Sequence, residues 1–150
     1  INLLFTIFGM LLIDNFGRRF LMFIGSIGYI FSLLSISLAF YMNVDGLIVV
    51  FFVFLFIASH AIGQGAVIWV FFAEIFPNNV RTKGQSIGSG VHWVFAALIA
   101  LLMPYFLSQF AAFMIFGFFA IMMVFQLIFV FYFMPETRQK TLESLAENYS

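Results

Sequence analysis

The chain of 150 residues has no cysteine, only three prolines and very few charged side chains. Without cysteine it can form neither a disulfide framework nor a thiolate metal site. Only 8% of its residues are charged, whereas a soluble domain carries about 25%. Six Lys and Arg balance six Asp and Glu, so no excess positive charge is present to bind nucleic-acid phosphates. The composition therefore excludes nucleic acid as a partner.

Apolar side chains take the place of the missing charge. Hydrophobic residues make up 65% of the chain and aromatic residues 21%, with 25 phenylalanines. So much large apolar surface suits contact with lipid better than contact with water. The chain begins at Ile1 inside an apolar run, without a signal peptide, which indicates that an N-terminal part is missing. We therefore expect part of an all-α integral membrane protein, located in the cell membrane.

Charged residues divide the chain into apolar segments of membrane-spanning length. A spanning helix needs about 20 apolar residues, and residues 84–135 carry no charge, which is enough for two helices. We place the break between them near Pro104 to Gln109, where polar residues and a proline cluster. The predicted spans lie near 1–13, 20–40, 47–76, 84–105 and 110–134. The first span is partial and the other four are complete.

The cations lie on one side of this arrangement. Alternating spans place the segments 14–19, 77–83 and the tail together, and all six Lys and Arg fall in these three segments. The positive-inside rule assigns that side to the cytoplasm, so we expect a multi-pass protein with a cytoplasmic C-terminus. Residues 1–136 form the predicted helix bundle. Residues 137–150 are predicted to form an amphipathic cytoplasmic tail helix, with a disordered tail as the alternative.

Charged side chains at the helix ends predict a network on the cytoplasmic face. Glu74 lies at the inner end of a long apolar helix, where a carboxylate is costly unless it is paired, and Arg81 is its expected partner. Such a network latches the face when it is closed and separates when it opens. Simple positive-inside anchors are the alternative. The candidate network residues are Asp14, Arg18, Arg19, Glu74, Arg81, Glu136 and Arg138.

Two tryptophans lie deeper than the membrane interface, where tryptophan usually concentrates. Trp69 follows two glycines within the span 47–76, and Trp93 follows His92 in the next span. An indole face covers the C–H bonds of a sugar while neighbouring polar groups bind its hydroxyls. The alternative is that both are core residues. Likewise, the glycines either line a cavity or allow close helix packing, and His60 either serves the site or bonds a neighbouring helix.

Five segments in order carry a specific family resemblance. They are DNFGRR (14–19), GQGAVIW (63–69), EIFPNNVR (74–81), HW (92–93) and PETRQKTLE (135–143). Together they resemble the second half of the sugar porter family of the major facilitator superfamily. The resemblance implies the C-terminal part of a twelve-helix bundle, from the end of the eighth span through the twelfth span and the tail.

The resemblance also implies roles for individual residues. Sugar contacts are implied for Asn2, Gln64, Gly65, Trp69, His92 and Trp93. Arg18, Arg19, Glu74, Arg81 and Glu136 match the family's cytoplasmic gate network. In the motif GQGAVIW, non-proline residues stand where the family usually has prolines, so we expect this helix to bend less.

These observations favour secondary transport of a monosaccharide, a hexose or a pentose, by alternating access. The expected partners are the sugar, a coupled proton, the lipid bilayer and the missing N-terminal half. No cofactor, metal or catalytic residue is expected, because the spans carry no H-E-x-x-H motif or comparable catalytic set. The alternatives are a truncated remnant that does not transport, a channel, or a major facilitator for another small polar solute.

Overall fold

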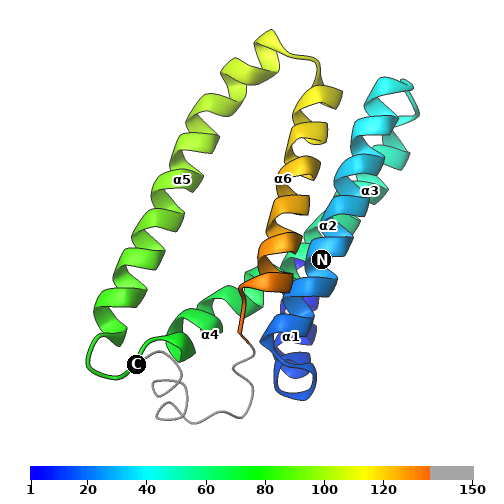
Figure 1. Ribbon diagram of the computed structural model, residues 1–150. Coiled ribbons are helices and arrows are strands. Elements are labelled where there is room, and N and C mark those ends of the chain that lie inside the picture. The colour runs from blue at the N-terminus through cyan, green and yellow to red at the C-terminus, as the bar shows by residue number, and fades with distance from the viewer. Residues whose placement is uncertain (136–150) are drawn as a thin grey trace.

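The computed structural model describes residues 1–135, and nearly all of this part is helical (Figure 1). The predicted tail helix, Glu136 and Arg138 lie outside the described residues. The helices are α1 (Asn2–Phe16), α2 (Arg18–Tyr41), α3 (Gly46–His60), the π-helical segment η1 (Ala61–Gly65), α4 (Ala66–Ile75), α5 (Arg81–Gln109) and α6 (Ala112–Tyr132). In this part of the chain, α2, the continuous stretch α3–η1–α4, α5 and α6 are each long and apolar enough to cross a membrane, and α1 is shorter. The predicted all-α membrane fold is confirmed.

Local sequence features determine where the helices begin and turn. Gly17 has a positive φ of 89°, which glycine adopts without steric cost, and this lets α1 and α2 meet with a single residue between them. Asp45 accepts a hydrogen bond from the backbone N–H of Leu47 at 3.3 Å, which makes it the N-cap of α3. Pro77 follows α4 closely and prevents its continuation.

The predicted break near Pro104 to Gln109 is too early. Pro104 lies inside α5, which continues to Gln109, and the chain turns at Phe110, whose N–H still bonds to the carbonyl of Phe106 at 2.9 Å. One proline removes one backbone hydrogen bond, whereas leaving the helix within lipid would leave several groups unsatisfied. The helix therefore continues through the proline. It also begins earlier than predicted, at Arg81.

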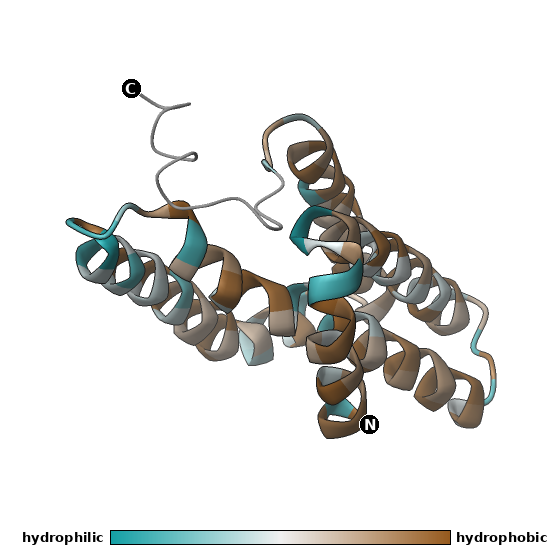
Figure 2. Cartoon of the chain, turned by 90° about the horizontal axis from the view of Figure 1, so that it is seen from below, coloured by the Kyte–Doolittle hydropathy of each residue, from teal (hydrophilic) through white to brown (hydrophobic). Residues whose placement is uncertain are grey.

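The helix α2 packs chiefly against α6 and α3, and the buried apolar core joins α2 to α1, to α4 and to the end of α6. This core consists of Ile13, Leu21, Met22, Val67, Val130 and Met134. By contrast, α5 has no buried residue and stands apart from the other helices (Figure 1). Hydrophobic residues dominate the helices, and hydrophilic residues gather at the helix ends and turns (Figure 2). These exposed apolar surfaces are suited to lipid and to further helices.

Glycines bring two pairs of helices into close contact. A Cβ on Gly63 would lie 2.8 Å from the Cα of Gly25, so the backbones of η1 and α2 touch. This supports close packing as one role of the motif glycine, as small residues provide in membrane helices. A Cβ on Gly84 would lie 2.6 Å from the Phe76 ring, so α5 begins against the end of α4.

Candidate functional site

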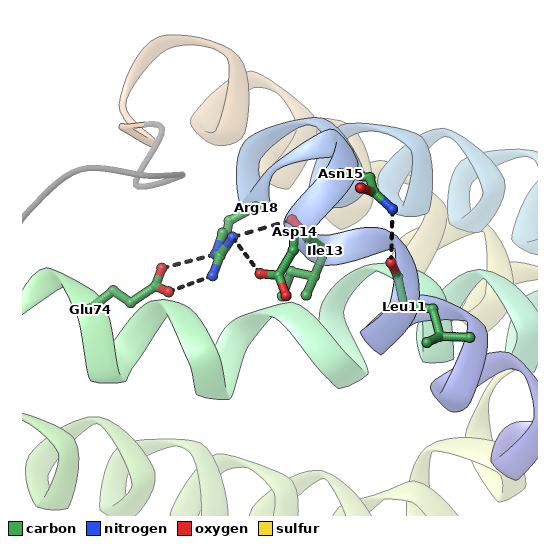
Figure 3. A network of polar contacts seen from close by, with 6 residues as sticks. All are labelled: Leu11, Ile13, Asp14, Asn15, Arg18 and Glu74. Atoms are coloured by element: carbon green, nitrogen blue, oxygen red, sulfur yellow. Dashed lines mark hydrogen bonds and ion pairs between the residues drawn. The ribbon is translucent and has the colours of Figure 1, made fainter.

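An ion pair joins three helix ends at the charged end of the bundle. Arg18, the first residue of α2, donates from Nε to Glu74 Oε2 at 2.9 Å and from Nη2 to Glu74 Oε1 at 2.6 Å (Figure 3). Its Nη1 also donates to the carbonyl of Ile13 at 3.2 Å and lies 3.3 Å from Asp14 Oδ1. Arg18 therefore lies between α4 and the end of α1.

The geometry and burial make this a strong pair. The guanidinium and the carboxylate meet through two parallel N–H···O bonds, which is the most specific arrangement available to them. The Arg18 side chain is 10% exposed and that of Glu74 is 26% exposed, whereas that of Asp14 is 79% exposed. The Glu74 carboxylate at the end of an apolar helix thus has the partner that its low-dielectric surroundings require.

Arg81 was the predicted partner of Glu74, but it bonds elsewhere. Its Nε donates to the carbonyl of Phe76 at 3.3 Å, and its Nη2 is buried without a hydrogen-bond partner within residues 1–135. The last carbonyls of a helix have no partner within the helix, and the turn at Pro77 brings Arg81 back onto one of them. The prediction was wrong because residues close in sequence were taken as partners.

Arg19 joins a further helix to the same end. Its Nη2 donates to the backbone carbonyl of Phe131 in α6, and its guanidinium carbon lies 6.0 Å from the centroid of the Phe131 ring. Such a contact combines a hydrogen bond with a cation–π interaction. Of the predicted network, the structure thus brings together Asp14, Arg18 and Glu74, and it places Arg19 on α6.

An aromatic cluster lies between α4 and α5. The ring centroids of Trp69 and His92 are 5.3 Å apart at an interplanar angle of 80°, and those of His92 and Trp93 are 5.4 Å apart at 80°. Edge-to-face geometry is favourable for aromatic rings, and it leaves ring faces open. We call Trp69, His92 and Trp93 the ring cluster.

The ring cluster is not part of the core in residues 1–135. Trp69 is 40% exposed and Trp93 is 64% exposed, whereas core residues such as Val67 are fully buried. His92 lies eleven residues into α5, or about 16 Å from its start at 1.5 Å per residue. An exposed ring cluster at this depth can meet a ligand or another helix.

The other predicted sugar contacts lie elsewhere. Asn2, at the start of α1, accepts a hydrogen bond from Thr6 at 3.2 Å between Oγ1 and Oδ1. The Gln64 side chain turns toward α2, where its Nε2 donates to Ser26 Oγ at 3.2 Å while its Oε1 is buried without a partner in the described chain. Gly65 lies against the imidazole of His60.

His60 bonds a neighbouring helix, which was one of the two alternatives predicted for it, but its partner was not predicted. The hydroxyl of Tyr29 in α2 is hydrogen-bonded to Nδ1 of His60 at the end of α3. A signal was present in the sequence, because Ser26 and Tyr29 are polar residues three apart in an apolar helix and therefore share a face. Both side chains turn toward the stretch α3–η1–α4.

An apolar cavity of about 710 Å³ opens between α5 and α6, and no residue of the ring cluster lines it. Its lining consists of aromatic, aliphatic and Met side chains, among them Phe95, Leu102 and Phe119. A sugar site needs convergent polar groups as well as apolar surface. The cavity is thus a poor match for a polar solute.

The chain matches known transporters in sequence and in fold. The family described as "Sugar (and other) transporter" matches residues 1–149. The chain belongs to this family. Its backbone superposes with a TM-score of 0.92 on the inward-open xylose transporter of Escherichia coli, at 31% identity, covering 98% of this chain and 33% of that one.

Curated relatives agree with the structural match to the family. The chain is 31% identical to the D-xylose-proton symporter of Escherichia coli strain K12, over 97% of this chain and 31% of the relative. It is 30% identical to the arabinose-proton symporter of Bacillus subtilis, over 97% of this chain and 32% of the relative. The chain thus spans about a third of the length of these relatives. The resemblance drawn from the sequence motifs is confirmed.

Proposed function

We propose that this chain forms the C-terminal part of a transporter that carries a monosaccharide across the membrane by alternating access. The ring cluster of Trp69, His92 and Trp93 is the observation that carries this proposal, because exposed aromatic faces beside an imidazole suit a sugar. An indole face covers the apolar C–H surface of a pyranose, and His92 bonds a hydroxyl. Family membership supports a sugar, and the substrates named for the two relatives, xylose and arabinose, are both pentoses.

Transport needs no covalent chemistry. The sugar binds outward-facing and inward-facing states with different free energies, and the protein interconverts between them. The contacts of Arg18 with Asp14 and Glu74 support a latch, because they join the ends of α1, α2 and α4 at one end of the bundle. We assign this end to the cytoplasm on the positive-inside rule, which also places the C-terminus there.

A coupled proton is the second ligand that we propose. Both relatives are proton symporters by name. Sugar-driven proton uptake into proteoliposomes, read with a pH-sensitive dye, tests this part separately. Sugar uptake without proton movement would indicate that the protein is a uniporter.

Sugar binding is tested by tryptophan fluorescence of the full-length protein. Titration with D-xylose, L-arabinose and D-glucose should change the emission in a saturable manner, and His92→Ala should weaken the response about two- to tenfold, because one hydrogen bond is lost. Tyr132→Phe, at an exposed ring of α6 away from the ring cluster, is the matched control and should respond like the parent. A parent protein that responds to none of the sugars would favour a remnant or another polar solute.

A further inference from the structure

We propose that His60, held by Tyr29, is a further specificity-determining residue that donates a hydrogen bond to one sugar hydroxyl. The inference rests on the proposed function and adds a group outside the ring cluster. It is carried by the π-helical turn, by the bond between Tyr29 and His60, and by the place of the imidazole against Gly65.

The π-helical segment η1 determines where the imidazole lies. A π-turn bonds residue i to i+5 and is often found at functional sites, so residues five apart come to lie one above the other. His60 and Gly65 are five apart, and a Cβ on Gly65 would lie 3.2 Å from His60 Nε2 and 3.3 Å from its Cδ2. The absence of a side chain on Gly65 thus leaves room for the outer edge of the imidazole.

This edge lies against Gly65, which precedes Trp69 of the ring cluster by one helical turn. Trp69 is four residues after Gly65, so the two share a helix face and are separated along the axis by about one turn of 5.4 Å. That separation is comparable to the width of a pyranose ring. The ring of His92 in turn contacts Trp69, with ring centroids 5.3 Å apart. A sugar lying on Trp69 would therefore come within reach of both histidines.

Tyr29 determines which imidazole nitrogen carries the proton. The Tyr29 side chain is buried, and its ring packs on Phe56 with centroids 4.8 Å apart. The Tyr29 hydroxyl is hydrogen-bonded to His60 Nδ1, and we assign the hydroxyl as the donor because this gives its buried proton a partner. In a neutral imidazole the other nitrogen then carries the hydrogen. His60 Nε2 is thereby fixed as a donor, and its ring orientation is fixed as well.

The test compares two His60 variants in the full-length protein. His60→Gln keeps an N–H donor, whereas His60→Leu removes it at similar size. Binding is measured by tryptophan fluorescence with the best sugar and with its complete set of monodeoxy analogues. We expect His60→Leu to weaken binding of the parent sugar about three- to tenfold, the value of one hydrogen bond. It should cause no further loss for the one analogue that lacks the bonded hydroxyl, and His60→Gln should restore part of the affinity.

Tyr29→Phe tests the positioning role without touching the sugar. It removes the Tyr29 hydroxyl and keeps the ring on Phe56. The loss of affinity should therefore depend on the same sugar hydroxyl as the loss in His60→Leu. Tyr41→Phe, at the exposed end of α2, is the matched control and should bind the whole set like the parent. If His60→Leu folds poorly, Tyr29→Phe still decides the outcome.

Two results would overturn the proposal, and they can be told apart. If the parent binds sugar while Tyr29→Phe and His60→Leu both bind the sugar and every analogue as tightly as the parent does, the pair only locks α2 to α3. A lower melting temperature in Tyr29→Phe would accompany that result. If the parent binds none of the sugars, the proposed function itself fails, and this inference with it.

Discussion

Truncation of either Arg18 or Glu74 should cost far more stability than their joint replacement. The Arg18 and Glu74 side chains are 10% and 26% exposed and share two short hydrogen bonds. Removing one partner of a buried pair leaves an uncompensated charge and costs about 3–5 kcal/mol. Because Glu74 keeps some access to solvent, we expect about 2–4 kcal/mol for Glu74→Ala or Arg18→Ala. Replacing both with apolar residues of similar volume, Arg18→Met with Glu74→Leu, should cost much less than the sum.

The assay is a double-mutant cycle on the thermal unfolding of the full-length protein in detergent. A coupling free energy of about 2 kcal/mol or more is expected between the two positions. Asp14→Asn is the matched control, because the Asp14 side chain is 79% exposed and an exposed pair contributes about 0–1 kcal/mol. Strictly additive effects of Arg18→Met and Glu74→Leu would refute the reasoning that the pair acts as a unit.

Three further predictions follow from the spans, the ring cluster and the glycine contact. Asn43→Cys should be labelled by a membrane-impermeant maleimide from outside intact cells, and the label is specific because this chain has no other cysteine. Labelling only from the cytoplasmic side would show that the orientation is the opposite of the predicted one. Trp69→Ala should weaken sugar binding about ten- to a hundredfold with little change in melting temperature, because Trp69 is 40% exposed; unchanged affinity with a collapsed melting temperature would assign it to the core. Gly63→Ala should lower the melting temperature, because its Cβ would lie 2.8 Å from a backbone atom of α2, whereas Gly46→Ala meets nothing within 4 Å and should not; equal effects would contradict the close contact.

The spans could be predicted from the sequence because lipid imposes a simple length and polarity rule. Charged residues mark the helix ends, and Gly17 marks the turn between α1 and α2, as its positive φ of 89° shows. The end of α5 was misplaced because a proline signals a helix end in water more strongly than in lipid. Features of single residues and short segments therefore predict where a helix spans the membrane and where it ends.

Partners across helices were harder to predict. Glu74 pairs with Arg18, which is 56 residues away, and Tyr29 bonds His60, which is 31 residues away. Such contacts depend on where α2 crosses α3 and α4, and the close approach of Gly25 and Gly63 determines that crossing. The depth of Trp69 and His92 could be read from the sequence, but their ring contact follows from the turn between α4 and α5.

The π-helical turn was also beyond the sequence pattern. Missing prolines in GQGAVIW predict a helix that bends less, and the stretch from Gly46 to Ile75 is continuous. Its irregularity takes another form, because η1 widens the turn at Ala61–Gly65. Gly63 against α2 and Gly65 against His60 give two physical reasons why a wide turn fits there.

Uptake of labelled D-xylose into proteoliposomes tests the central claim most directly. The full-length protein and its His92→Ala variant are reconstituted at equal density, and uptake is measured with and without excess unlabelled sugar. We expect saturable uptake by the parent, inhibition by unlabelled D-xylose, L-arabinose or D-glucose, and weaker apparent affinity in the variant. Uptake no faster than in protein-free vesicles for every monosaccharide tried would contradict it.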